Sequence, residues 1–92
     1  MIRRRAIIEG RVQGVGFRYS AGRQAARLGI SGFARNRDDG SVEAEIEGEE
    51  TSVTSMLAWL QSGPHGAIVK SVTVSECEPR GGKEFQISHE ID

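Results

Sequence analysis

The sequence lacks most of the features that identify secreted and membrane proteins. Cysteine occurs once, at Cys77, so no internal disulfide can form, and a reducing, cytoplasmic setting is expected. The arginines at positions 3–5 resemble the start of a signal peptide, but only the apolar stretch 6–8 follows before Glu9. A signal peptide needs roughly 7–15 apolar residues at that point, and no run approaches the roughly 20 of a transmembrane helix. We therefore expect a cytoplasmic protein that does not contact membranes.

An excess of charge of either sign is also missing. Twelve basic and thirteen acidic residues give a net charge of −1 at pH 7. Proteins that bind nucleic acids concentrate basic charge against the phosphates, so we expect no nucleic-acid partner. A site for a soft metal is not expected, because the chain has no C-x-x-C pair and its two histidines, His65 and His89, lie far from Cys77 in the sequence. We expect no bound metal.

Hydropathy patterning predicts the order of the structural elements. Alternation of apolar and polar residues is typical of a strand with one buried face, and recurrence every third or fourth residue is typical of an amphipathic helix. Strands are predicted over residues 2–12, 32–36, 42–47 and 68–75, with a short last strand that carries Phe85 and Ile87. Helices are predicted over residues 17–28 and 53–60, where Gly29 and the 62–64 stretch are expected to end them.

This order, β-α-β-β-α-β with a short extra C-terminal strand, predicts an α+β sandwich of the ferredoxin-like kind. Each strand, with the fourth as the possible exception, has one polar face. The antiparallel sheet is therefore expected to carry both helices on one face and to leave the other open. Ninety-two residues allow one hydrophobic core, so we expect a single domain over residues 1–92.

The outward face of the third predicted strand is acidic and carries Glu43, Glu45 and Glu47. An RNA-recognition module of the same element order displays aromatic side chains for base stacking, whereas three carboxylates would repel the phosphates of RNA. We interpret this acidic row as a solvated sheet face, with a partner-binding surface as the alternative.

The turn 12–18, with the sequence Val-Gln-Gly-Val-Gly-Phe-Arg, joins the first strand to the first helix. Glycine adopts positive φ readily, so several N–H groups can point toward one centre beside a helix N-terminus, where phosphate is the usual guest. Arg18 adds a guanidinium whose fork matches phosphate oxygens. The turn is not a nucleotide fingerprint, since Tyr19 stands where G-x-G-x-x-G has its third glycine. No histidine is tied to Ser20, which we interpret as a hydroxyl on the first helical turn. The sequence predicts a phosphate cradle.

Asn36 ends the second predicted strand, immediately before an Asp39-Gly40 hairpin turn. If the strand order is 4-1-3-2, this position need not lie far from the cradle. A carboxamide can accept a hydrogen bond from water and donate one to a phosphoryl oxygen, so Asn36 could orient a water toward a bound phosphate. An asparagine before a turn also commonly caps the local backbone. The residues alone leave both roles open.

These blocks resemble the acylphosphatase family over almost the whole chain. The resemblance rests on the turn 12–18, on Asn36 with the stretch 39–43, on Gly63-Pro64 and on the closing Phe85 and Ile87. It implies hydrolysis of acyl phosphates, which are small carboxyl–phosphate mixed anhydrides, to a carboxylate and inorganic phosphate, without a metal or other cofactor.

The family's functional residues match positions in this sequence. The resemblance implies that Arg18 binds the substrate phosphate together with the backbone of the cradle residues Gly14, Val15, Gly16 and Phe17. It also implies that Asn36 positions the attacking water. The Asp39-Gly40 pair is expected to shape the hairpin and to have no chemical role.

Two alternatives are consistent with these residues. The same fold and cradle could belong to a non-catalytic module that binds phosphate or another anion. The chain also resembles the leading domain of hydrogenase maturation proteins, whose chains continue into zinc-finger and larger domains. With one cysteine and ninety-two residues, a freestanding enzyme fits better, and we expect a monomer.

Overall fold

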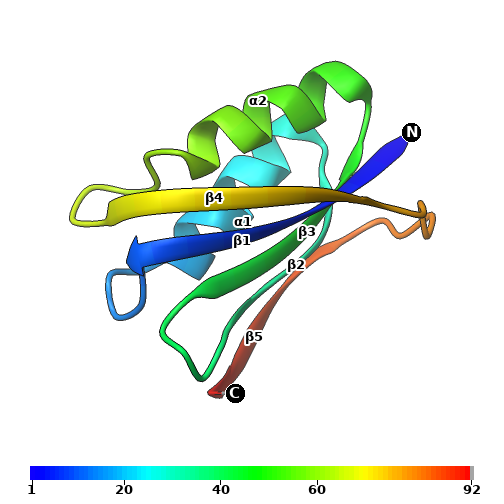
Figure 1. Cartoon of the computed structure of the whole chain (residues 1–92). Coiled ribbons are helices and arrows are strands. Elements are labelled where there is room, and N and C mark those ends of the chain that lie inside the picture. Colours follow the sequence, from blue (N-terminus) through cyan, green and yellow to red (C-terminus); the bar gives the residue numbers. More distant parts are fainter. Residues whose placement is uncertain (92) are drawn as a thin grey trace.

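A computed structural model describes the backbone of residues 1–91 and the side chains of residues 1–88. The elements follow in the order β1 (Ile2–Arg11), α1 (Phe17–Leu28), β2 (Ser31–Asn36), β3 (Val42–Gly48), α2 (Glu50–Leu60), β4 (Ile68–Cys77) and β5 (Phe85–Ile91). The strands form a sheet of order β4-β1-β3-β2-β5, and both helices cover the same face of it (Figure 1). The predicted α+β, ferredoxin-like sandwich is confirmed. No helix in the described part of the chain is long and apolar enough to cross a membrane.

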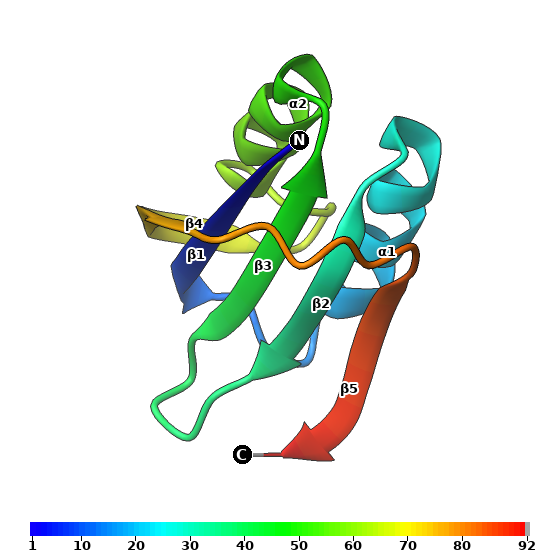
Figure 2. The same ribbon diagram turned by 90° about the vertical axis from the view of Figure 1, so that its right-hand side faces the viewer.

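The last strand departs from the expectation of a wholly antiparallel sheet. β1 pairs antiparallel with β3 and β4, and β2 pairs antiparallel with β3, but β5 lies parallel to β2. The cause is the path of residues 78–84, which cross the sheet at one end between β4 and β5 (Figure 2). A strand that starts at that end must run in the same direction as β2.

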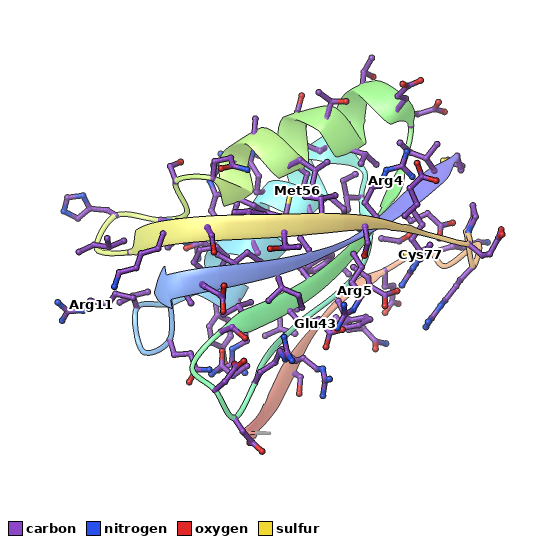
Figure 3. All side chains as sticks on the ribbon, viewed as in Figure 1. Arg4, Arg5, Arg11, Glu43, Met56 and Cys77 are labelled. Atoms are coloured by element: carbon purple, nitrogen blue, oxygen red, sulfur yellow. The ribbon has the colours of Figure 1, made fainter. Side chains whose placement is uncertain are left out.

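Small side chains allow α1 to approach the sheet closely. Ala44 of β3 pairs with Ala6 of β1 on one side and with Ala34 of β2 on the other, and all of these side chains are fully buried. The buried positions of α1 include Ala21 and Ala25. The larger core side chains include Ile8, Ile46, Met56 and Leu60, and Met56 projects from α2 toward the sheet (Figure 3).

The acidic row of β3 is buried, so the expectation of a solvated sheet face is wrong. Glu43, Glu45 and Glu47 are 5%, 7% and 4% exposed. Arg3 donates from Nε to Glu45 (2.7 Å) and from Nη1 to Glu47 (2.9 Å). Alternation within one strand shows which face a side chain takes, but not which side chains of the neighbouring strands cover it.

Glu43 shows the same arrangement at the other end of the row. Its carboxylate accepts hydrogen bonds from Nε of Arg5 on β1 (2.6 Å) and Nε of Arg35 on β2 (2.5 Å). Arg5 and Glu43 lie together on the sheet face opposite the helices (Figure 3). Burial raises the pKa of Glu43, but the hydrogen bonds from the two guanidinium groups outweigh it and hold the pKa below its usual range. Carboxylates and guanidinium groups therefore cover this face of the sheet together.

Glu47 also anchors the crossing segment 78–84. Its carboxylate accepts hydrogen bonds from the backbone N–H groups of Arg80 (2.7 Å) and Gly81 (2.9 Å). The hydrogen bond from Arg80 N–H is the largest cause and lowers the pKa of Glu47. Burial has a smaller effect and raises the pKa, and the hydrogen bonds from Gly81 N–H and Arg3 lower it further. The acidic row thus helps to fix the segment that delivers β5 to the sheet edge.

Replacing Glu47 should destabilise the fold. Glu47→Gln removes a charge that faces the buried Arg3, which is 4% exposed in the wild type, and keeps the size of the side chain. Hydrogen bonds to charged groups contribute about 1.5–3 kcal/mol, so we expect a fall of that order in the free energy of unfolding in urea at neutral pH. Glu76→Gln, on the exposed edge strand β4, is the matched control and should change little.

The same pair of proteins tests the direction of the pKa shift. The pKa of Glu47 is lower in the folded protein than in the unfolded chain, so its stabilising effect is complete above the ordinary glutamate pKa of about 4.3. The effect is lost as pH falls through the folded-state pKa. The stability difference between wild type and Glu47→Gln should therefore shrink from neutral to acidic pH. A difference that stays constant down to about pH 3 would contradict the assignment.

Candidate functional site

The sheet order places the turn 12–18 and Asn36 at the same end of the molecule. β1 and β2 both run antiparallel to β3, so they are parallel to each other and their carboxyl ends lie together. Val42 pairs with Ile8 of β1 and with Asn36 of β2. Asn36, which precedes the hairpin, and the end of β1, which leads into the turn 12–18, therefore lie on either side of Val42.

A pocket of about 200 Å³ lies at this end of the sheet. It is lined by Val12, Gly14, Gly16, Phe17, Arg18, Tyr19 and Asn36. The structure thus brings together most of the site residues named from the sequence. Val15 differs, because its side chain packs against the hydrophobic core and leaves only its backbone in the turn. None of the described residues that line the pocket is an aspartate, a glutamate or a histidine.

The cradle has the backbone conformation that its glycines predict. Gly14 and Gly16 both have φ near 75°, in the left-handed region that L side chains rarely adopt. Gly16 is the N-cap of α1, and its carbonyl accepts the hydrogen bond of Ser20 N–H (3.0 Å). The first N–H groups of a helix have no intrahelical acceptor. Here no side chain caps them, and the first turn of α1 contains no acidic residue.

An anion is the natural partner for such a helix end. The partial positive charge at a helix N-terminus and the unpaired N–H groups both favour a negative group. The N–H groups of Phe17, Arg18 and Tyr19 belong to this end of α1, next to the pocket that these residues line. The backbone can therefore bind a phosphate oxygen without help from a side chain.

Phe17 holds the end of the cradle in the core. Its side chain is 2% exposed, and its ring packs against Trp59 of α2 with centroids 5.5 Å apart. The ring also lies close to Gly63, where an added Cβ would come within 2.4 Å of it. The loop after α2 therefore needs glycine at this position. Through the contact of Trp59 with Phe17, α2 packs against a residue that lines the pocket.

A contact with β5 orients the side chain of Arg18. Its Nη1 donates a hydrogen bond to the backbone carbonyl of Ser88. A guanidinium has further N–H donors in a planar fork, so this contact can fix the plane of the group and leave donors for an anion in the pocket. The strand whose direction the sequence does not reveal thus sets the orientation of the cationic side chain.

Asn36 is the last residue of β2 before the hairpin turn, and its side chain lies on the face of the sheet that the helices cover. It is 8% exposed and lies two residues after the fully buried Ala34, so the two side chains share a face. The described residues provide no hydrogen-bond partner for its carboxamide, and it lines the same pocket as Gly14, Gly16 and Arg18. The local cap considered from the sequence is therefore not formed.

Asp39, and not Asn36, caps the backbone of the hairpin turn. The carboxylate of Asp39 accepts hydrogen bonds from Ser41 N–H (3.0 Å) and Ser41 Oγ (2.5 Å), and these bonds lower the pKa of Asp39. Gly40 has φ 91°, and its N–H donates to the carbonyl of Arg37 (3.1 Å). The prediction that Asp39-Gly40 shapes the hairpin is confirmed.

Gln13 is the residue of this site that sequence reasoning missed. Its Nε2 donates hydrogen bonds to the carbonyl oxygens of Arg37 (2.8 Å) and Ser41 (2.9 Å), at the two ends of the hairpin turn. A glutamine beside two glycines in a strand-to-helix turn gives no sign of which distant carbonyls it meets. These two hydrogen bonds are visible in the structure, and no residue pattern in the sequence predicts them.

The nucleophilic and metal-binding residue types lie elsewhere. Cys77 ends β4 and pairs with Arg3 at the start of β1, at the other end of the sheet; burial raises the pKa of its thiol. Ser20 Oγ accepts a hydrogen bond from Arg23 (3.3 Å), and His65 is exposed in the loop after α2. The side chain of His89 lies outside the described residues. Within the described part of the chain, no group of three His, Cys, Asp or Glu residues is placed to hold a metal ion.

Comparison with known proteins decides the family. The acylphosphatase family model matches residues 4–87. The chain belongs to the acylphosphatase family. It is 42% identical over 92 residues to an acylphosphatase of Trichormus variabilis, covering 100% of this chain and 91% of that protein.

Solved structures agree with this assignment. The crystal structure of an acylphosphatase from Bacillus subtilis superposes with a TM-score of 0.90 at 37% identity, covering 97% of this chain and all of that one. Full-length HypF, in a phosphate- and nucleotide-bound form, matches with a TM-score of 0.87 at 29% identity, covering 99% of this chain and 12% of HypF. As a member of this family, the chain is a hydrolase that acts on small-molecule acyl phosphates, with inorganic phosphate as a product.

The left-handed glycine at the helix start can be tested directly. An added Cβ at Gly16 meets no atom within 4 Å, so Gly16→Ala introduces backbone strain without a clash. Left-handed conformation costs an L-residue about 1–2 kcal/mol, and we expect the free energy of unfolding to fall by that amount. Gly82→Ala is the control, because Gly82 lacks positive φ and its nearest atom is 3.9 Å away. Equal stability of Gly16→Ala and wild type would show that the loop does not need this conformation.

Proposed function

We propose that the acylphosphatase reaction takes place in the pocket between the start of α1 and the end of β2. In this proposal, Arg18 and the backbone N–H groups of residues 14–18 bind the substrate phosphoryl group, and Asn36 positions the attacking water. The observation that carries the proposal is the composition of one pocket of about 200 Å³, which combines an uncapped helix N-terminus, a guanidinium and a carboxamide.

Binding of the phosphoryl group follows from charge. The non-bridging oxygens accept hydrogen bonds from the cradle amides and from the Arg18 guanidinium, which the Ser88 carbonyl holds in place. Phosphoryl transfer depends mostly on positioning and on charge stabilisation at these oxygens. Donors that are fixed before the reaction stabilise the developing charge without reorganisation. We propose that these groups suffice without a metal ion or another cofactor.

The chemical step needs a directed water. The Asn36 carboxamide oxygen accepts a hydrogen bond from water while its N–H group donates to a phosphoryl oxygen. The water oxygen then bonds to phosphorus as the bond from phosphorus to the acyl oxygen breaks, and the electron pair leaves with the carboxylate. The described pocket lining contains no carboxylate or imidazole to act as a base. We propose that a phosphoryl oxygen of the substrate accepts the proton.

The proposal extends to the organisation of the protein. Every group assigned a role comes from one chain, so the site requires no second copy, and we propose a monomer that acts as a single domain over residues 1–92. The single cysteine and the near-zero net charge support a cytoplasmic protein without a nucleic-acid partner.

Arg18 is the first test of the binding half. A single fixed donor to a developing oxyanion is worth about 10²–10³ in rate, or about 2.7–4 kcal/mol, and Arg18→Ala should lose at least that much kcat/KM. Arg18→Lys should also be severely impaired, because a point charge does not reproduce the guanidinium fork. The assay follows phosphate release from benzoyl phosphate in the presence of EDTA.

Arg23 provides the matched control. It is an exposed arginine of the same helix, and Arg23→Lys should retain wild-type activity. Arg18 variants that stay within threefold of wild type would refute the role of this residue. Wild-type turnover that disappears on chelation would refute metal independence, and phosphate binding without turnover would favour a non-catalytic module.

Asn36 is the test of the catalytic half. In Asn36→Ala the cradle and Arg18 are unchanged, so the inhibition constant of inorganic phosphate should stay near that of wild type. Turnover should fall by about 10²-fold, because a reactant that is misplaced by about 1 Å loses this much rate. Steady-state kinetics on benzoyl phosphate measure both quantities. Turnover within threefold of wild type would show that Asn36 does not position the water.

A further inference from the structure

The sheet splits at the end that carries the proposed site. The last pair between β1 and β3 joins Ile8 to Val42. Beyond it, β1 pairs with β4 alone, through a bulge between Glu9 and Gly10, and continues to Arg11. The segment that leads into the cradle therefore diverges from the hairpin turn 37–41, and no strand pairing links the two.

Gln13 bridges this split. Its Nε2 donates to the carbonyl of Arg37 at 2.8 Å and to the carbonyl of Ser41 at 2.9 Å. These two residues close the turn, because Arg37 N–H donates to the Ser41 carbonyl at 2.9 Å. A single side-chain nitrogen thus contacts both ends of the turn, and its own backbone lies next to Gly14 of the cradle.

The position of this contact suggests a role in the reaction. Arg37 directly follows Asn36, and Gln13 directly precedes Gly14, so the bridge joins the immediate neighbours of the proposed water-positioning residue and the proposed phosphate cradle. Its two acceptors are backbone atoms, so the link fixes the main chain and not only a side-chain rotamer. The distances of 2.8 and 2.9 Å lie in the ordinary range of N–H···O hydrogen bonds.

We propose that Gln13 is a positioning residue for acyl phosphate hydrolysis. Its carboxamide holds the backbone that carries Asn36 at a fixed distance from the cradle, and thereby sets the distance between the water and phosphorus. This inference rests on the proposed function of Asn36 and Arg18. Gln13 itself does not contact the reacting atoms in this role.

The inference predicts a separation of turnover from binding. Gln13→Ala leaves Arg18 and the cradle amides in place, so KM and the inhibition constant of inorganic phosphate should stay within threefold of wild type. The backbone of Asn36 gains freedom, and kcat should fall roughly 10- to 100-fold, up to the loss caused by a displacement of about 1 Å. Gln61→Ala, an exposed glutamine at the end of α2, should have wild-type constants.

A double-mutant cycle distinguishes positioning from general support of the fold. If Gln13 acts through Asn36, Gln13→Ala should lower kcat no further once Asn36→Ala is present. Independent, multiplicative losses would overturn the inference, because they indicate that Gln13 affects the site by another route. Proportional losses of kcat and phosphate affinity would overturn it as well.

Gln13→Glu keeps the size of the side chain and provides a pH signature if Gln13→Ala does not fold. An ionised carboxylate cannot donate to the carbonyls of Arg37 and Ser41 and is repelled by them, whereas the protonated acid regains one O–H donor. The ratio of variant to wild-type kcat should rise as pH falls, while Gln61→Glu should show a constant ratio. A constant ratio for Gln13→Glu would overturn the inference.

The outcomes separate this inference from the proposal beneath it. If Asn36→Ala loses turnover while Gln13→Ala and Gln13→Glu keep it, the role of Gln13 is refuted and that of Asn36 stands. If Asn36→Ala keeps wild-type turnover, both are refuted.

Discussion

The antiparallel pairing of β3 with both β1 and β2 is the constraint on which the proposed site depends. It makes the two outer partners parallel, so that the turn after β1 and the last residue of β2 emerge at the same end of the sheet. A slip of one residue in β2 would turn Asn36 to the face away from the helices. The alanine row 6–44–34 and the buried glutamates of β3 both oppose such a slip, because each face accepts one set of side chains.

Charge serves opposite purposes in two parts of this small molecule. On the outer sheet face, the carboxylates of β3 are enclosed by arginines of β1 and β2 and by backbone N–H groups of the crossing segment. At the start of α1, positive groups gather with no acidic side chain in the first turn. The overall charge of −1 conceals this division. The paired charges hold the sheet together, and in the proposed function the unpaired ones are available to substrate.

Much of this organisation could be predicted from the sequence. Alternation and helical spacing give the elements, because burial on one face imposes those periods. The cradle is recognisable because left-handed backbone requires glycine at positions 14 and 16. The parallel β5, the burial of Glu43, Glu45 and Glu47, and the bridge from Gln13 could not be predicted. Each depends on which distant segment lies alongside, and a local pattern carries no record of its neighbours across the sheet.

The uncapped start of α1 has a consequence for folding as well as for the reaction. The first turn of α1 contains no acidic residue, and no side chain caps its N–H groups. The unfolded chain does not present this arrangement. Any anion that occupies it is therefore a ligand of the native state alone and shifts the folding equilibrium by mass action. In the proposed function, the inorganic phosphate released at each turnover also stabilises the enzyme that produced it, so conformational stability and product concentration are thermodynamically linked.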